Sequence, residues 1–250
     1  MKRALLGVAL LVSLSASAYV LPQGAILRRM VEARSELQLV GLRVEGAAVF
    51  SGASRDAAAS ALGLPGDRPE LSADGTLSLK LPGRCRLDVG TPDGKRAGMV
   101  MNAGRRKAVG PELAALGAAL EQVCPLLAAR SGSDAEAKAA LERHLRALGV
   151  EERRSSLARI GGDVAYVLGN PADGKSQLWV YKDTFRPARV RSTDKAGTAW
   201  DVRFIDFGSP TTGEWMPRTI EVWRGTERVL RFTALKGDSR AALAESLFAL

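Results

Sequence analysis

The sequence predicts an α+β protein in which helices cover the concave face of a highly curved antiparallel sheet. Apolar and polar residues alternate along many short segments, as expected of strands with one buried face. Short turns join these segments, and short turns can connect antiparallel but not parallel strands. Three longer stretches space their apolar residues as helices do, and these helices must cover the apolar face of the sheet.

The predicted domain opens with a helix and a strand. In residues 24–37, apolar residues recur at steps of three and four, as on an amphipathic helix. In residues 40–50, they occupy every second position, which predicts a long, half-buried strand. Residues 51–75 are rich in Gly, Ala, Ser, Asp and Pro without a sustained period. We expect a loop there, with a turn of helix near 57–62.

Further strands are expected before the central helices. Alternation resumes at residues 77–81, breaks at Pro82 and Gly83, and restarts at residues 85–89. A turn at residues 91–94 then leads to a strand at 97–102.

Two helices are predicted in the middle of the chain. Residues 111–129 carry leucines and a valine at three- and four-residue steps, and Pro125 should kink or end this helix. The second helix begins at Ser133, whose hydroxyl can cap the backbone while Glu136 reciprocates. It is expected to end before Gly149.

The remaining half of the chain, residues 155–236, is predicted to form consecutive antiparallel strands. Leu178 and Val180 should face the concave side of the sheet. Trp179 and Tyr181 should then lie on the convex side, covered by neighbouring side chains, a loop or a partner.

Residues 1–18 are interpreted as a secretory signal peptide, cleaved before Tyr19. Two basic residues precede an apolar run, and three small residues follow it. A membrane anchor is the alternative, but it needs roughly 20 apolar residues, and this run is shorter. We therefore expect a soluble periplasmic protein with no transmembrane span in the mature chain.

Cys85 and Cys124 are the only cysteines, and export would take both to an oxidising compartment. We expect them to form a disulfide that closes a loop of about 40 residues, which would stabilise the protein by about 3 to 4 kcal/mol. Two buried free thiols are the alternative. A metal site is not expected, because such sites need more cysteine and histidine.

The net charge of +9 favours anionic partners in general. The basic residues are nevertheless scattered over alternating strands, as on a solvated sheet face, and an exported protein seldom meets nucleic acid. The compact basic cluster at residues 105–107 is expected on an exposed loop. His144, the only histidine, has no paired nucleophile and is interpreted as a surface residue. The sequence contains no G-x-S-x-G motif, no P-loop and no G-x-G-x-x-G motif. The sequence therefore predicts no enzyme and no cofactor.

Three runs of sequence resemble the LolA/LolB-like superfamily, the exported carriers of outer-membrane lipoproteins. In "GGDVAYVLGNPADGKSQLWVYKDTFRPARVR", a strand ends in an aspartate-containing turn and Pro187 precedes the next strand. In "VRFIDFGSPTTGEWMPRTIEVWRG", Phe207 follows Asp206, and the chain leads through a glycine to a proline and another strand. The closing run "LAESLFAL" places Phe248 where the family has its characteristic phenylalanine.

The resemblance implies an incomplete antiparallel β-barrel closed by helices, with an interior that accepts acyl chains. The chain is interpreted as one LolA/LolB-like domain, residues 19–250, whose central segment departs from the family by a helical insertion around 105–150. One departure concerns a basic residue that takes part in lid gating in the lipoprotein carrier, because Leu81 occupies that position here and Lys80 lies one step away on the opposite face. The residues expected to line the interior, each of which could equally be ordinary core, are Val40, Leu42, Val44, Leu77, Leu79, Leu87, Val202, Phe204, Ile220 and Val222.

Two functions remain open at this point. The protein is expected to be a periplasmic carrier or sensor that binds acyl chains of lipoproteins or other lipids in a hydrophobic cavity. The alternative is a non-enzymatic module with the same fold and a packed core, which binds or regulates another envelope protein. A cavity of several hundred Å³ would favour the carrier, since that is the usual size of ligand sites. A filled core would favour the module.

Overall fold

The computed structural model describes residues 20–128 and 132–250. The predicted signal peptide, residues 1–18, and its cleavage site before Tyr19 lie outside the described residues. Among the helices of the described part, none is both long and apolar enough to cross a membrane.

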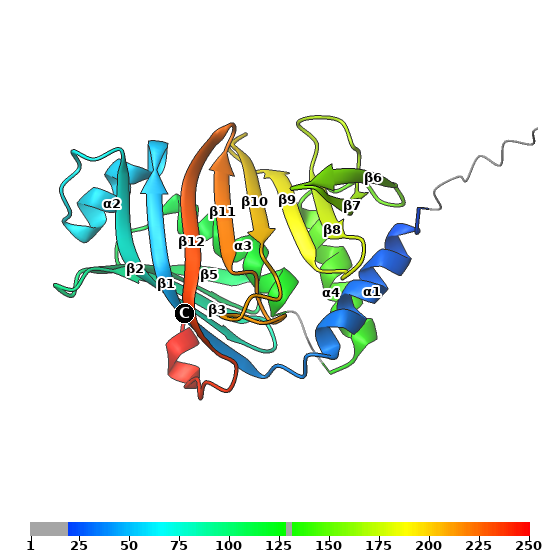
Figure 1. Ribbon diagram of the computed structural model, residues 1–250, viewed down its shortest axis with the longest axis horizontal. Coiled ribbons are helices and arrows are strands. Elements are labelled where there is room, and N and C mark those ends of the chain that lie inside the picture. Colours follow the sequence, from blue (N-terminus) through cyan, green and yellow to red (C-terminus); the bar gives the residue numbers. More distant parts are fainter. Residues whose placement is uncertain (1–19, 129–131) are drawn as a thin grey trace, which may run out of the picture.

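Twelve antiparallel strands form a single curved sheet that stays open between its edge strands β5 and β6 (Figure 1). The order across the sheet is β5-β4-β3-β2-β1-β12-β11-β10-β9-β8-β7-β6, so β1 and β12 bring the two ends of the domain together. The strands are β1 (Gly41–Ser51), β2 (Glu70–Lys80), β3 (Arg84–Gly90), β4 (Arg96–Asn102), β5 (Arg105–Val109), β6 (Ser155–Ile160), β7 (Asp163–Leu168), β8 (Gln177–Tyr181), β9 (Pro187–Thr193), β10 (Ala199–Ile205), β11 (Thr219–Arg224) and β12 (Glu227–Asp238).

The helices cover the concave face of this sheet, with α3 and α4 behind the strands in the view of Figure 1. Their bounds are α1 (Gln23–Ser35), α2 (Arg55–Leu62), α3 (Ala114–Leu127) and α4 (Asp134–Ala147), with short 3-10 helices η1 (Gly52–Ser54) and η2 (Glu245–Phe248). Helix α3 packs against β3, β4, β10 and β11, and α4 packs against α1. The predicted fold class, an α+β incomplete barrel with helices on its concave side, is therefore confirmed.

Both ends of α4 and the C-terminal end of α3 follow the sequence signals, whereas α3 begins at Ala114, three residues after the predicted start. The backbone N–H of Glu136 donates to the Ser133 hydroxyl at 3.2 Å, and the backbone N–H of Ser133 donates to the Glu136 carboxylate at 3.2 Å. This is the predicted capping box, which satisfies two N–H groups that the helix leaves unpaired. Pro125 lies in the last turn of α3, which ends at Leu127. Gly149, with a φ of 76°, follows α4.

Two segments that we expected to be loops contain strands. Strand β2 begins at Glu70 and pairs with β1 along its whole length. Its buried positions include Ala73 and Gly75, and a Cβ on Gly75 would lie only 2.8 Å from the Phe232 ring. This part of the strand therefore requires small residues at its buried positions, whereas a strand is recognised in sequence by large apolar residues at those positions. The basic cluster at residues 105–107 lies on edge strand β5, where exposed charges discourage pairing with another chain.

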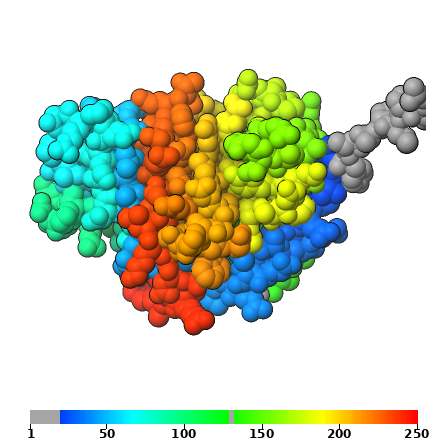
Figure 2. Space-filling view, viewed as in Figure 1, coloured from blue at the N-terminus to red at the C-terminus, as the bar shows by residue number. Residues whose placement is uncertain are grey.

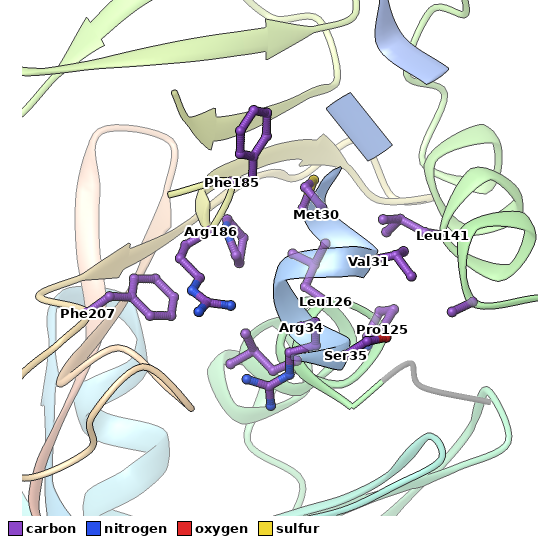
Figure 3. A pocket seen from close by; sticks show the side chains of 13 residues that line it. Met30, Val31, Arg34, Ser35, Pro125, Leu126, Leu141, Phe185, Arg186 and Phe207 are labelled. Atoms are coloured by element: carbon purple, nitrogen blue, oxygen red, sulfur yellow. The ribbon is translucent and has the colours of Figure 1, made fainter. Parts of the chain in front are cut away.

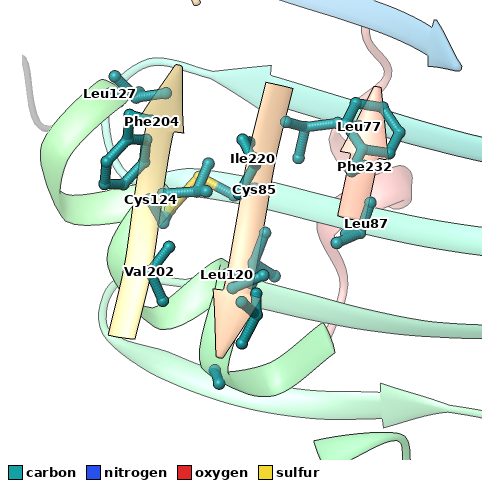
Figure 4. Packing of buried hydrophobic residues seen from close by; sticks show 14 of the residues in the cluster. Leu77, Cys85, Leu87, Leu120, Cys124, Leu127, Val202, Phe204, Ile220 and Phe232 are labelled. Atoms are coloured by element: carbon teal, nitrogen blue, oxygen red, sulfur yellow. A yellow bond between two sulfur atoms is a disulfide. The ribbon is translucent and has the colours of Figure 1, made fainter. Parts of the chain in front are cut away.

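The disulfide between Cys85 and Cys124 is present and joins β3 to α3 (Figure 4). The Cα atoms of the two residues are 5.7 Å apart, and both side chains are buried in the core. The covalent bond therefore fixes α3 against the sheet at the centre of the apolar layer.

Strand β8 carries apolar and aromatic residues on both faces. Leu178 and Val180 are buried in the core, as expected. On the other face, the Arg189 guanidinium lies 5.3 Å from the centre of the Trp179 ring, and the Tyr181 hydroxyl donates to the main-chain oxygen of Phe204 at 3.1 Å. The Phe207 ring also packs edge-on against Tyr181, with ring centres 6.5 Å apart, so neighbouring side chains cover both aromatics. Figure 2 shows this outer face of the sheet as a continuous surface across β10, β11 and β12.

The C-terminal segment folds back over the outside of β3 and β4. Phe248 is completely buried there, in a small cluster with Val100 and Leu243. Lys80, the last residue of β2, donates to the main-chain oxygen of Leu243 at 2.6 Å and forms an ion pair with Glu245 at 2.8 Å. In this structure Lys80 therefore fastens the C-terminal segment to the sheet.

Candidate functional site

Most of the residues predicted to line an acyl-binding interior face the concave side, but α3 fills the space beneath them. Side chains of α3, among them Leu120 and Leu127, pack against them in Figure 4. Val40 precedes β1 and is 72% exposed. The other nine are at most 4% exposed and belong to the core: Leu42, Val44, Leu77, Leu79, Leu87, Val202, Phe204, Ile220 and Val222. Their contact with a ligand remains a prediction, and the open spaces lie elsewhere.

One open space is a groove of about 960 Å³ that α3 and α4 form with two turns of the sheet. Pro82 comes from the turn between β2 and β3, and Met101 from the end of β4. Pro125 of α3 and Ala140 and Leu148 of the α4 segment complete the apolar part of the lining, and the charged residues Glu121, Glu136 and Arg143 also line the groove.

His144 lies on the wall of this groove and is half-buried, whereas the sequence suggested a surface histidine. Its helix turns this face toward α3, where Nε2 of His144 lies 3.0 Å from Oε1 of Gln122. Burial lowers the pKa of His144 to about 4, so the ring is neutral at neutral pH. The groove therefore offers an uncharged imidazole and a buried amide beside its apolar wall.

A second, much smaller space is a hollow of about 30 Å³ on the other face of α4, where α1, the end of α3 and the turn between β8 and β9 meet (Figure 3). Met30 and Val31 reach it from α1, Leu126 from α3, Leu141 from α4 and Phe185 from the turn. Its volume is enough for one or two water molecules or a single small group.

Two arginines, Arg34 and Arg186, also line this hollow, whose other lining residues are apolar apart from Ser35 (Figure 3). Arg34, near the end of α1, donates from Nη1 to the main-chain oxygen of Trp215. Arg186, from the turn between β8 and β9, donates from Nη1 to the main-chain oxygen of Ala33 at 2.7 Å. Carbonyl groups in the last turn of a helix lack intrahelical partners, so Arg186 satisfies one of them and favours the negative end of the helix dipole.

The electrostatic balance of the hollow is positive. The carboxylate of Glu214 lies 3.5 Å from Nε of Arg186, while Arg34 forms no ion pair with any residue that the structure describes. Burial and, secondly, the charge of Arg186 lower the pKa of Arg34 to about 9. Sequence reasoning missed this pair because a hydrogen bond across 153 positions brings Arg186 to the end of α1, and no local pattern marks it.

Within residues 20–128 and 132–250, there is no cluster of three or more His, Cys, Asp or Glu side chains that could hold a metal ion. Candidate ligand-binding groups in these two spaces are the apolar walls of the groove and the guanidinium groups of the hollow.

No model of a known protein family matches this sequence, and no curated protein matches it either. Solved structures do resemble it over most of its length. A LolA superfamily protein from Nitrosomonas europaea is 13% identical, with 92% of this chain and 99% of that chain covered and a TM-score of 0.47. A putative outer membrane lipoprotein-sorting protein domain from Vibrio parahaemolyticus is 13% identical, covers 89% and 97%, and has a TM-score of 0.42. A DUF1329 family protein from Desulfovibrio piger is 14% identical, covers 90% and 96%, and has a TM-score of 0.44.

Proposed function

We propose that this protein binds acyl chains of lipoproteins or other lipids, as a non-enzymatic carrier or sensor in the periplasm. The groove between α3, α4 and the turns of the sheet carries this proposal. Its volume of about 960 Å³ falls within the range of roughly 300 to 1,000 Å³ that is usual for small-molecule sites.

The chemistry of the groove suits a hydrocarbon chain. Pro82, Met101, Pro125 and Leu148 supply apolar contact surface, and a methionine adapts its shape to irregular ligands. Burial of one methylene group contributes about 0.8 kcal/mol, so six buried methylenes contribute about 5 kcal/mol. An acyl chain therefore needs no directed polar contact to be held there.

A substitution that fills the groove tests this proposal. Ala140 lines the groove, whereas Ala147, at the end of the same helix, is exposed. We expect the neutral fluorophore N-phenyl-1-naphthylamine to bind the wild-type protein and to be displaced by uncharged dodecyl glucoside. Ala140→Trp should weaken the binding of both at least 10-fold, and Ala147→Trp should leave it unchanged.

Two results would contradict acyl-chain binding in the groove. One is a wild-type protein that binds neither the fluorophore nor the glucoside. The other is an Ala140→Trp variant that is folded, as judged by circular dichroism, and still binds both like the wild type.

The filled core favours a second function, the envelope protein-binding or regulatory module. Its candidate surface is the convex face, where Arg189 and Arg203 share the carboxylate of Asp201 at 2.5 and 3.0 Å. Chemical cross-linking in periplasmic extracts tests it. Loss of a specific cross-linked protein on Arg189→Glu, with acyl-probe binding absent from the wild type, would support the module and exclude the carrier.

A further inference from the structure

The two arginines of the hollow have more hydrogen-bonding groups than their structural role uses. Their Nη1 atoms hold α1 in place through hydrogen bonds, in which Arg34 donates to the main-chain oxygen of Trp215 and Arg186 donates to that of Ala33. Nε and Nη2 of Arg34 and Nε of Arg186 are buried and have no hydrogen-bond partner among the residues described. A buried donor without a partner costs free energy, and the cost is larger for a charged group.

The charges of the hollow also lack compensation. Glu214 faces Arg186 only at 3.5 Å, and its side chain is 49% exposed, so water weakens this ion pair. Arg34 has no carboxylate partner in the part of the chain that the structure describes. The arginines of the convex face differ, because Arg189 has two hydrogen bonds to the Asp201 carboxylate.

The low pKa of Arg34 has the same origin. Burial and the neighbouring guanidinium of Arg186 both disfavour the charged form of Arg34. An anion between the two groups would reverse both effects, because it would supply an opposite charge and acceptors for the buried N–H groups.

We infer that Arg34 and Arg186 form a binding site for one anionic group, a carboxylate or a phosphate. The planar guanidinium group matches these anions with two parallel hydrogen bonds. A hollow of about 30 Å³ accommodates a single such group, and its walls of Met30, Val31 and Leu126 tolerate a hydrocarbon beside it. The anion can therefore be the head group of an amphiphile or a free ion.

This site is separate from the proposed acyl-chain groove, because Ala137 and Leu141 of α4 face the hollow while Ala139 and Ala140 face the groove. The inference therefore does not depend on the proposed function.

Isothermal titration calorimetry tests the inference with three probes, which are dodecyl phosphate, uncharged dodecyl glucoside and inorganic phosphate. Wild-type protein should bind dodecyl phosphate at least 10-fold more tightly than the glucoside. Arg34→Gln and Arg186→Gln should abolish this preference, and Arg34→Lys, which keeps the charge but loses the planar fork, should retain part of it. Arg29→Gln is the matched control, because Arg29 lies on the same helix with a side chain that is 61% exposed.

The inorganic phosphate arm identifies the source of the anion. Binding of inorganic phosphate with an affinity similar to that of dodecyl phosphate, lost in Arg34→Gln, supports the site with a free ion as ligand. Binding of dodecyl phosphate alone supports the site with a lipid head group as ligand.

The inference is overturned if wild-type protein binds dodecyl phosphate and the glucoside equally, a result that leaves acyl-chain binding intact. It is also overturned if folded Arg34→Lys and Arg186→Gln keep the full preference for phosphate. Absence of glucoside binding with intact, arginine-dependent phosphate binding contradicts the groove proposal instead.

Discussion

Reduction of the disulfide between Cys85 and Cys124 should lower the free energy of unfolding by about 4 kcal/mol. The bond joins residues 39 positions apart in sequence. In the chain-entropy model, a closed loop of this length removes about 13 cal/mol/K from the unfolded chain, which is about 4 kcal/mol at 25 °C. Reduction removes no heavy atom from the core, so no cavity contributes to the effect.

The bond should resist reductant while the protein is folded. Cys85 is 0% and Cys124 is 2% exposed, so a reducing agent reaches the sulfur atoms only after the sheet and α3 separate. The reduced protein is therefore best prepared in denaturant and refolded in the presence of reductant. In unreduced denatured protein, neither cysteine should react with a thiol reagent.

Urea unfolding, followed by tryptophan fluorescence, compares the oxidised and reduced forms. For a protein of this size, a change of about 4 kcal/mol corresponds to a thermal midpoint lowered by roughly 8 to 16 °C. The double variant Cys85→Ala/Cys124→Ala should not respond to reductant. A difference below about 1 kcal/mol between the oxidised and reduced forms would refute the reasoning, because the unfolded chain would then gain nothing from the constraint.

Two further predictions concern α4. The pKa of His144 is about 4 in the folded protein and about 6.5 when unfolded, so the unfolded chain binds more protons between these values. The contribution of His144 to the free energy of unfolding should be fully present above pH 6.5 and should be lost as the pH falls toward 4. The loss should be on the order of 1 to 2 kcal/mol, because the ring borders an open groove where solvent screens its charge. His144→Gln should remove this part of the pH dependence in urea unfolding. Ser133→Ala removes the capping box and should cost about 1 kcal/mol in the same assay at neutral pH, whereas an unchanged midpoint would contradict the role of the cap.

The sequence predicted the strands whose buried positions carry large apolar residues. The beginning of β2 has the same alternation, with Leu71, Ala73 and Gly75 buried, but alanine and glycine contribute little to an apolar period. Strand β5 carries arginine or lysine at three consecutive positions, because both of its faces are exposed there, and only its pairing with β4 defines it. Tertiary contacts, and not local sequence, thus determine that these two segments are strands.

The site was predictable only in part, for a related reason. Alternation identified nine residues that face the concave side, including Phe204 and Val222. A period of two cannot tell whether a ligand or another helix covers such a face, and here Leu120 and Leu127 of α3 do so. The groove is lined in part by turns of the sheet, and turn residues such as Pro82 carry no periodic signal.

The anion site also shows how little residue alternation predicts outside a strand. Arg186 and Arg189 are three residues apart in the run "FRPARVR", yet they meet opposite environments. Arg189 belongs to β9, where alternation directs it outward to Asp201 and Trp179. Arg186 precedes that strand and follows Phe185, whose φ of 54° takes the backbone out of the extended conformation, so strand alternation does not extend back to it. The Arg186 side chain therefore contacts the end of α1 instead of water. This change of backbone direction in the turn places a second guanidinium group beside Arg34.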